Sequence, residues 1–201
     1  TTSSAASDVY KRQVYGGVAG DVMGQDCQEM KALHDPDETV LDEELTRAMT
    51  PFSQKSGDVT ALRNRLQDVM WEDVGVMRDA DGLQRGLKRI AEIDDELSSV
   101  GVAADNLAFN LSWHDWLNLR SLIDMSMVIG KAALSRENSR GAHFREDFPD
   151  AGAMQESYFT LASGYGDAIS VTRAPVQFTI VKPGETLLGE DEAETLIKAA
   201  Q

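Results

Sequence analysis

The residues best suited to chemistry lie in one run, residues 135–149, whose sequence is SRENSRGAHFREDFP. The run combines three arginines, a histidine and three acidic residues around a glycine. Because the planar fork of arginine suits bidentate binding of carboxylates, Arg140 and Arg145 could hold a dicarboxylate. His143 could act as a general acid–base, since Glu146 or Asp147 would move its pKa across neutrality.

A structural interpretation of the same run is more economical, and we favour it. His143 would then hydrogen-bond to a backbone carbonyl. Arg140 and Arg145 would form ion pairs with nearby acids (Glu137, Glu146 and Asp147) or with an adjoining domain. Gly141 would supply the left-handed residue that ends a long helix and turns the chain. The expected structural or interface network comprises Arg136, Arg140, Gly141, His143, Arg145, Glu146 and Asp147.

The composition excludes several functions. A net charge of -15 argues against binding to nucleic acid or to an anionic membrane surface, since both would repel this chain. One cysteine, Cys27, rules out an internal disulfide and favours a reducing compartment, and the scattered histidines offer no zinc ligand cluster. The longest apolar segment, near residues 116–134, is interrupted by Arg120, Asp124 and Lys131, so we expect no direct membrane insertion.

Three amphipathic segments must position the charged run. The first begins behind Asp58, a plausible cap, and carries apolar residues at helical spacing as far as Val74. The second opens behind residues 79–81 and closes near Gly101. The third, about residues 112–138, is apolar around much of its circumference and must sit between neighbours. Short connections then predict a mainly α fold, an antiparallel three-helix bundle.

The large apolar side chains of these segments are expected in the core. A stacking platform for a cofactor is the alternative for the tryptophans, but their helical spacing among leucines favours packing. The methionines are interpreted in the same way, as adaptable filler. The residues concerned are Trp71, Trp113, Trp116, Met49, Met70, Met77, Met125 and Met127.

The flanking segments are simpler. Residues 1–13 are predicted to be a non-native or disordered tail, and a helix near residues 41–49 should end at Pro51. Residues 151–201 are predicted to form a β-hairpin-like extension and an acidic tail. Within them we expect three strands, at residues 157–161, 168–172 and 176–181, lying against the bundle or a further domain, then a turn at residues 182–185.

The charged run resembles a family signature, Arg-x-x-Ser-Arg-Gly-Ala-His-x-Arg-Glu-Asp-aromatic-Pro. The signature lies near the end of succinate dehydrogenase and fumarate reductase flavoprotein subunits. Residues 62–78 are similar to the LRxxLQxxMWxxVGVxR helix of the same family, and residues 82–87 to its GLxxAL segment. Residues 14–20 look like the second half of SLADTxVFGRxAG, although Gly17 stands where an Arg is common.

The resemblance implies an N-terminally truncated flavoprotein. Residues 14–32 would be the closing helix of a missing FAD domain and residues 33–150 the helical C-terminal domain. The full enzyme would pass a hydride between FAD and a dicarboxylate and relay electrons to an iron–sulfur subunit. In this family the substrate and proton-delivery residues lie upstream. The resemblance therefore implies no catalytic, cofactor-binding or metal-binding residue in this chain, which alone should be inactive.

Alternatives remain open. Related L-aspartate oxidases and adenylylsulfate reductases share the architecture, and the chain could also be a non-enzymatic helical interaction module. The location implied by the resemblance is cytoplasmic, with attachment to the inner face of the membrane through partner subunits.

Overall fold

The protein is described here by a computed structural model. The structure describes residues 4–30, 32, 35–103, 105–164 and 168–185. The chain divides into two compact units, Thr1–Thr46 and Arg47–Gln201, which meet within one helix. The predicted division at residue 32 between an FAD domain and a helical domain stays a prediction.

The first unit consists of helix α1 (Ser4–Glu29) and most of helix α2 (Glu38–Met49). Every side chain described between residues 12 and 46 is exposed, so this unit has no core among its described residues. Helix α1 includes residues 4–13, where we expected a disordered tail. That these residues are not native stays a prediction.

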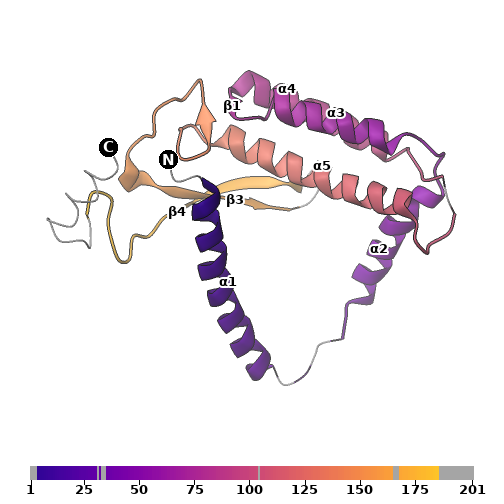
Figure 1. Ribbon diagram of the computed structural model, residues 1–201, viewed down its shortest axis with the longest axis horizontal. Helices are drawn as coiled ribbons and strands as arrows, with labels where there is room; N and C mark the ends of the chain where they lie inside the picture. Colours follow the sequence, from indigo (N-terminus) through magenta and orange to yellow (C-terminus); the bar gives the residue numbers. More distant parts are fainter. Residues whose placement is uncertain (1–3, 31, 33–34, 104, 165–167, 186–201) are drawn as a thin grey trace. The chain divides into compact units, whose positions relative to one another are not determined.

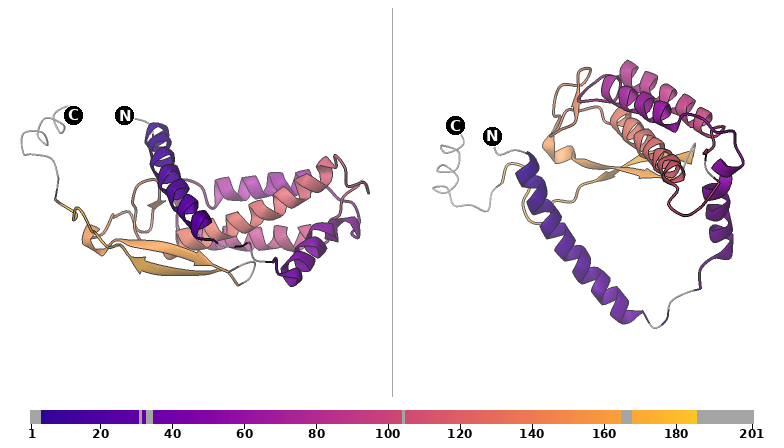
Figure 2. Two further views of the ribbon diagram at one scale, coloured as in Figure 1. Left: turned by 90° about the horizontal axis from the view of Figure 1, so that it is seen from below. Right: turned by 45° about the vertical axis from the view of Figure 1, so that its right-hand side comes forward.

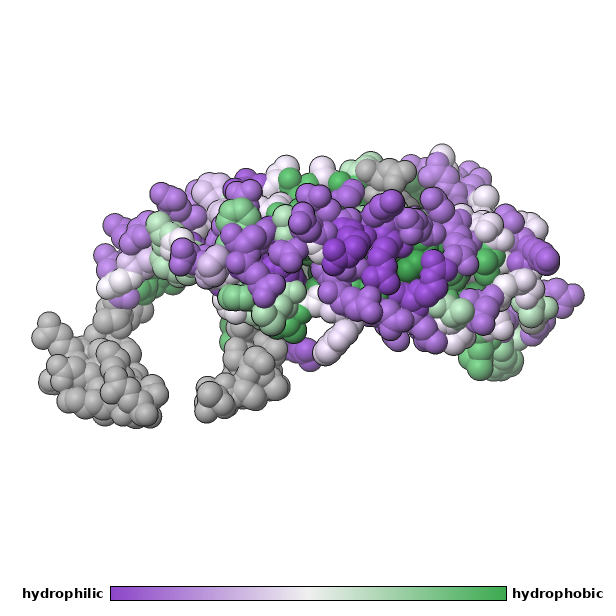
Figure 3. All heavy atoms as spheres, turned by 90° about the horizontal axis from the view of Figure 1, so that it is seen from above, coloured by the Kyte–Doolittle hydropathy of each residue, from purple (hydrophilic) through white to green (hydrophobic). Residues whose placement is uncertain are grey.

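The second unit is built on the predicted antiparallel three-helix bundle, formed by α3 (Val59–Glu72), α4 (Ala80–Leu97) and α5 (Leu111–Ser135) (Figures 1 and 2). The three helices enclose one hydrophobic core. Its buried members are Leu62, Leu66, Val69, Val74, Leu83, Ile90, Ile93, Leu97, Trp116, Leu119, Ile123 and Ala133. The outer surface above α3 and α4 is mainly hydrophilic (Figure 3).

Local capping explains where the three helices begin. Asp58 Oδ1 accepts a hydrogen bond from the Ala61 amide at 2.9 Å, which confirms the predicted cap of α3. Asp79 and Asn110 cap α4 and α5 through the same kind of bond. A capping side chain satisfies one of the amides that the first helical turn leaves unpaired.

The two ends of the bundle are closed by short connections. Pro51 ends α2 as expected, and a 3-10 turn, η1 (Thr50–Phe52), follows. Between α3 and α4 lies a two-residue strand, β1 (Met77–Arg78), which pairs in parallel with β2 (Phe144–Arg145). This pairing, which we did not predict, joins the start of α4 to the segment after α5.

An antiparallel hairpin of β3 (Tyr158–Ser163) and β4 (Ser170–Pro175) follows a 3-10 turn, η2 (Met154–Glu156), and confirms the predicted β appendage. It packs on α5, where Lys131 Nζ donates to the Ile169 carbonyl at 3.1 Å. A two-stranded ribbon is marginal alone, so this support is required.

The third predicted strand, residues 176–181, is wrong: these residues form bends and irregular backbone. The β-branched composition suggested a strand, but the hairpin offers no further pairing beyond the bond from the Val176 amide to the Ser157 carbonyl, 2.9 Å. The turn at residues 182–185 is confirmed by Gly184 at φ +89°. The predicted acidic tail lies outside the described residues.

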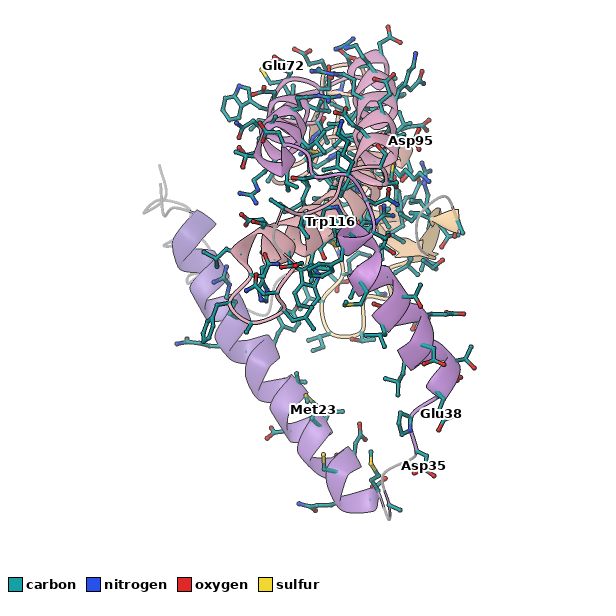
Figure 4. The ribbon with its side chains drawn as sticks, turned by 90° about the vertical axis from the view of Figure 1, so that its right-hand side faces the viewer. Met23, Asp35, Glu38, Glu72, Asp95 and Trp116 are labelled. Atoms are coloured by element: carbon teal, nitrogen blue, oxygen red, sulfur yellow. The ribbon has the colours of Figure 1, made fainter. Side chains whose placement is uncertain are left out.

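Some expected core residues are exposed. Trp116 is buried and donates from Nε1 to the Val100 carbonyl at 2.8 Å, and it lies among the bundle helices in Figure 4. Trp113 is half-buried. Trp71, in contrast, is 80% exposed, because it lies on the side of α3 opposite Leu66 and Val69.

The methionines divide in the same way. Met49, Met70 and Met127 are partly buried, as expected. The prediction was wrong for Met77 and Met125, which are 62% and 57% exposed. Met125 lies on α5, so one side of that helix is apolar but uncovered.

Replacing one core residue tests this arrangement. Leu119 is fully buried, so Leu119→Ala should lower the free energy of unfolding by about 2–5 kcal/mol. Leu122→Ala on the same helix removes the same atoms from a side chain that is 46% exposed, and should change it by about 0.5 kcal/mol. Urea denaturation of the 201-residue chain measures both. Equal losses would contradict the packing of α5.

Candidate functional site

The segment after α5, residues 136–149, is called the charged turn below. Helix α5 ends at Ser135 and Arg136 is already extended, at φ -92° and ψ 110°. The charged turn therefore begins three residues earlier than the predicted helix end. Its side chains turn back onto α5, onto the start of α4 and onto the hairpin.

Arg145 is the centre of the charged turn, and its side chain is 1% exposed. Its Nη1 donates to the backbone carbonyls of Ala133, Leu134 and Arg136 at 3.0, 3.1 and 3.0 Å. These carbonyls lie at the end of α5, where a helix leaves its last acceptors unpaired. The guanidinium therefore caps α5, and its positive charge suits the negative end of the helix dipole.

A second edge of the planar Arg145 guanidinium binds Asp147. Nε and Nη2 donate to the two carboxylate oxygens at 2.7 and 2.6 Å in a bidentate ion pair, and Asp147 is one of the three acids that the sequence offered as partners. Asp147 Oδ2 also accepts from the Ala80 amide at 2.9 Å, at the first turn of α4. One carboxylate thus joins the end of α5, through Arg145, to the start of α4.

The pKa of Asp147 reflects these contacts. The hydrogen bonds from Arg145 lower it from 3.8 to about 2, and the Ala80 amide adds to the effect, while partial burial opposes it. The carboxylate is therefore charged at neutral pH. It is a permanent partner of Arg145 and does not exchange protons in the neutral range.

Backbone pairing fixes the same junction. The Glu146 amide donates to the Arg78 carbonyl at 2.7 Å, alongside the parallel register that places Arg78 opposite Arg145. Ser139 Oγ accepts from the Arg145 amide at 2.9 Å and donates to the Phe148 carbonyl at 2.8 Å. These bonds hold the charged turn near Ser139 and again near residues 145–148. The predicted role of Glu146 as an ion-pair acid has no counterpart among these contacts.

Gly141 is left-handed, at φ +61°, as predicted, but it does not end α5. It lies in a tight turn closed by hydrogen bonds between Arg140 and His143, with N···O distances of 2.9 and 3.1 Å. A turn with positive φ at its first central position favours glycine. Gly141 therefore reverses the chain inside the charged turn.

The contacts of Arg140 differ from the predicted ion pairs. It binds backbone and hydroxyl groups of the segment that follows: Nη1 donates to Ser157 Oγ and Nη2 to the Ala153 carbonyl, both at 2.8 Å, while Nε donates to Ala151. The predicted ion pair with a nearby acid is replaced because the chain after residue 150 folds across the guanidinium. With all three nitrogens engaged, Arg140 is not arranged as a substrate clamp.

His143 has an arginine partner that was not expected, beside the backbone carbonyl of Arg136 with which it also interacts. Its Nδ1 lies 2.9 Å from Arg78 Nη1, so the ring accepts from an arginine side chain. Burial is the largest cause and lowers the pKa of His143. A hydrogen bond with the Arg136 carbonyl raises it, and the positive charges of Arg78, Arg136 and Arg145 lower it further, so the net shift is downward. The imidazole is therefore neutral at neutral pH, as an acceptor from Arg78 must be.

Arg136 connects the charged turn to the hairpin. Its guanidinium carbon lies 4.9 Å from the centre of the Tyr158 ring, and its Nη1 donates to Thr160 Oγ1 at 3.1 Å. Arg173 of β4 stacks on the same ring at 4.7 Å and donates to the Ser135 carbonyl. A cation over an aromatic face is attractive, so two arginines clamp Tyr158 onto the end of α5.

Sequence reasoning missed several members of this network, above all Arg78, Ser139 and Arg173. Arg78 ends the VGVxR motif and could have been assigned from it. Sequence reasoning also missed Asp73, whose side chain is 2% exposed. Its Oδ1 lies 2.6 Å from Arg85 Nη2, and its Oδ2 lies 2.8 Å from Arg89 Nη1. This buried carboxylate joins the end of α3 to α4.

Two further searches complete the site. Within the described part of the chain, no three His, Cys, Asp or Glu side chains are grouped so as to bind a metal ion. Nor does any described helix combine the length and apolar character needed to cross a bilayer. The charged turn is thus a set of hydrogen bonds and ion pairs between elements of this chain.

Comparison with known proteins gives this geometry a context. Residues 63–187 match the family described as "Fumarate reductase flavoprotein C-term". An uncharacterized FAD-dependent oxidoreductase of Methanocaldococcus jannaschii is 31% identical over 140 residues, which is 69% of this chain and 24% of that protein. The fumarate reductase flavoprotein subunit of Haemophilus influenzae is 25% identical over 191 residues, 94% of this chain and 32% of that protein.

Solved structures have a similar fold. Sdh1 of Mycobacterium smegmatis in complex with UQ1 is similar with a TM-score of 0.65 and 27% identity, covering 84% of this chain and 29% of that chain. Adenylylsulfate reductase of Archaeoglobus fulgidus, at 18% identity and a TM-score of 0.63, shows the same fold. The chain spans about a quarter to a third of the length of the curated relatives described above.

The capping role of Arg145 has a measurable consequence. Arg145→Ala should lower the free energy of unfolding by about 3–5 kcal/mol, because Asp147 and the helix carbonyls lose a buried partner. Arg65→Ala is a matched control: its ion pair with Glu96 is 48% exposed on both sides and should contribute about 0–1 kcal/mol. Denaturant titration of both variants gives the difference. Similar small losses would show that Arg145 does not hold the junction.

The charged state of Asp147 predicts a pH dependence. Its folded pKa lies below the ordinary value, so its contribution to stability is present above about pH 4 and is lost as the pH falls toward about 2. Asp147→Asn should remove this part of the acid sensitivity and lower stability at pH 7. Thermal unfolding from pH 7 to pH 2 provides the test. An unchanged acid profile in the variant would contradict the pairing.

Proposed function

The chain belongs to the succinate dehydrogenase and fumarate reductase flavoprotein family, whose C-terminal helical domain it carries, and we propose that it braces the FAD domain of such an enzyme. The observation that supports this most is the charged turn. Its side chains join the start of α4, the end of α5 and the hairpin, an arrangement suited to supporting another domain.

In this proposal the chain does not perform the chemistry itself. Arg145 and Arg140 direct their guanidinium nitrogens to partners inside the domain, and His143 binds Arg78. None of these three is arranged to hold a dicarboxylate or to move a proton. The substrate and proton-delivery residues would lie in the upstream part of the enzyme, with Arg136, Gly141 and Glu146 belonging to the supporting network.

The cavity beside α4 and α5 does not suit FAD. The cavity of 310 Å³ between α4, α5 and the hairpin is lined by Asp94, Asp95 and Asp124, with Lys131 as a basic residue. Asp94 and Asp124 pair with Arg120, Asp95 adds a further negative charge, and Lys131 donates to the Ile169 carbonyl, so this cavity presents little positive charge to the diphosphate of FAD. We therefore propose that the upstream domain binds the flavin and that this fragment alone does not.

The remaining assignments follow from the relatives and are proposals for the whole protein. The full enzyme would oxidise succinate or reduce fumarate, with FAD as the cofactor, and would pass electrons through an iron–sulfur subunit. It would lie in the cytoplasm, attached to the inner face of the membrane by partner subunits. The likeness to adenylylsulfate reductase supports that enzyme class as the second candidate.

Expression of two proteins tests the proposal. The 201-residue chain should be colourless and should show no succinate-dependent dye reduction. The product of the gene extended upstream should be yellow, retain stoichiometric flavin and reduce dye with succinate, because the FAD domain is then present. The same preparation assayed with AMP and sulfite, whose oxidation to adenylylsulfate would pass two electrons to the dye, distinguishes the second candidate.

Two outcomes would contradict the proposal. One is flavin bound tightly by the 201-residue chain. The other is an extended product with neither flavin nor activity toward either substrate class, which would favour a helical interaction module.

A further inference from the structure

His143 holds the charged turn to β1 through a hydrogen bond that exists in only one protonation state. Its Nδ1 lies 2.9 Å from Arg78 Nη1, and a guanidinium can only donate. The ring nitrogen must therefore be an unprotonated acceptor. An imidazolium ion carries a proton on both ring nitrogens, so protonation of His143 would replace this hydrogen bond with repulsion between two cations.

This contact lies where two segments far apart in the sequence meet. Arg78 belongs to β1, between α3 and α4, and His143 directly precedes β2. In the parallel pairing of these strands, Met77 lies opposite Phe144 and Arg78 lies opposite Arg145. A two-stranded pairing is marginal without support from its surroundings, and this one has only two residues in each strand. A change at His143 therefore acts directly on the pairing of β1 with β2.

The surroundings of His143 favour the neutral ring. Burial opposes its positive charge most strongly, and the bond to the Arg136 carbonyl offsets part of this effect. Three positive charges then act on the ring: Arg78 from β1, Arg136 from the end of α5 and Arg145 from β2. Asp147, the acid at the same junction, is already engaged in its bidentate pair with Arg145. The pKa of His143 is accordingly lowered from 6.5.

The other contacts of the junction do not respond to pH in the same range. Asp147 has a pKa of about 2 and stays charged, and arginine stays protonated. Bonds between backbone groups, such as that from the Glu146 amide to the Arg78 carbonyl at 2.7 Å, carry no titratable group. His114, the other histidine in the described part of the chain, is exposed near the opposite end of α5. Mild acid therefore acts on this junction through His143.

We propose that the contact between His143 and Arg78 is a pH-sensitive switch, in which protonation of the ring releases Arg78 and opens the pairing of β1 with β2. The pair of Arg145 with Asp147 stays intact, so α4 and α5 remain joined at their ends while β1 loosens. Histidine suits this role because modest changes in its surroundings move its titration across the range from about pH 5 to about pH 8. The inference does not depend on the proposed function, since every group in it belongs to this chain.

The direction of the pH dependence follows from the lowered pKa of His143. Between that pKa and 6.5, the ring of the opened form binds a proton and the ring of the closed form does not. The closed form is therefore favoured fully above about pH 6.5, and this preference is lost as the pH falls toward the lowered pKa. Within this window, the equilibrium constant for closing falls by up to about tenfold per pH unit.

Two NMR measurements on the 201-residue chain test the switch. Titration of the His143 ring protons in the folded chain should give a pKa below 6.5. Hydrogen exchange of the Glu146 amide should accelerate as the pH falls from about 7.5 to about 5, because this amide donates to the Arg78 carbonyl across the junction. Exchange is expressed relative to the amide of Ile123 in the core, which cancels the general effect of pH. The relative rate should rise by at least about threefold.

His143→Asn is the matched variant. The carboxamide oxygen of asparagine is as far along the side chain as Nδ1 and can accept from Arg78, but it does not titrate. The acceleration at Glu146 should therefore disappear in this variant. His114→Asn removes an exposed histidine as the control and should leave the acceleration unchanged.

Three results would overturn the inference. The first is a His143 pKa at or above 6.5 in the folded chain. The second is a relative exchange rate of Glu146 that does not change with pH, and the third is an equal change in the wild-type chain and in His143→Asn. If His143→Asn does not fold, Arg78→Gln takes its place. A neutral amide then faces the ring, so the pKa of His143 should rise, and an unchanged pKa would contradict the contact.

Discussion

The arrangement of this domain depends on the buried side chain of Arg145. The Arg145 side chain is 1% exposed, and a buried guanidinium is tolerated only when its charge and its donors are matched. Asp147 supplies the charge and the carbonyls at the end of α5 supply acceptors. This requirement fixes where α5 must stop and where the chain must turn. It also explains why Asp147, which reaches the Ala80 amide, aligns the start of α4 with the end of α5.

The rest of the domain is arranged around that junction. The parallel pairing of β1 with β2 sets the register of the charged turn, and Arg140 then anchors residues 151–157. Arg136 and Arg173 hold Tyr158 so that the hairpin lies along α5. The apolar core keeps the three helices together, and the polar junction fixes their ends. Such a body can support a neighbouring domain without taking part in its chemistry.

Much of the fold was predictable because it depends on local patterns. Helical spacing located α3, α4 and α5, and Asp58 and Pro51 marked helix boundaries. The hydrogen-bond partners of the charged side chains were less predictable, since they depend on tertiary contacts. Arg140 binds backbone carbonyls, and His143 binds Arg78. Trp71 and Met125 were assigned to the core because hydrophobicity alone does not show which side of a helix is covered. Family signatures identified the network as a whole but not its internal pairing.

A double-mutant cycle on Arg145 and Asp147 tests the central account most directly. Free energies of unfolding would be measured for Arg145→Met, for Asp147→Asn and for the two changes combined. If the pair holds the junction, the two losses should overlap, with a coupling energy of about 1–3 kcal/mol. A coupling near zero, with losses that simply add, would show that the two residues act independently, and the account of the junction would be wrong.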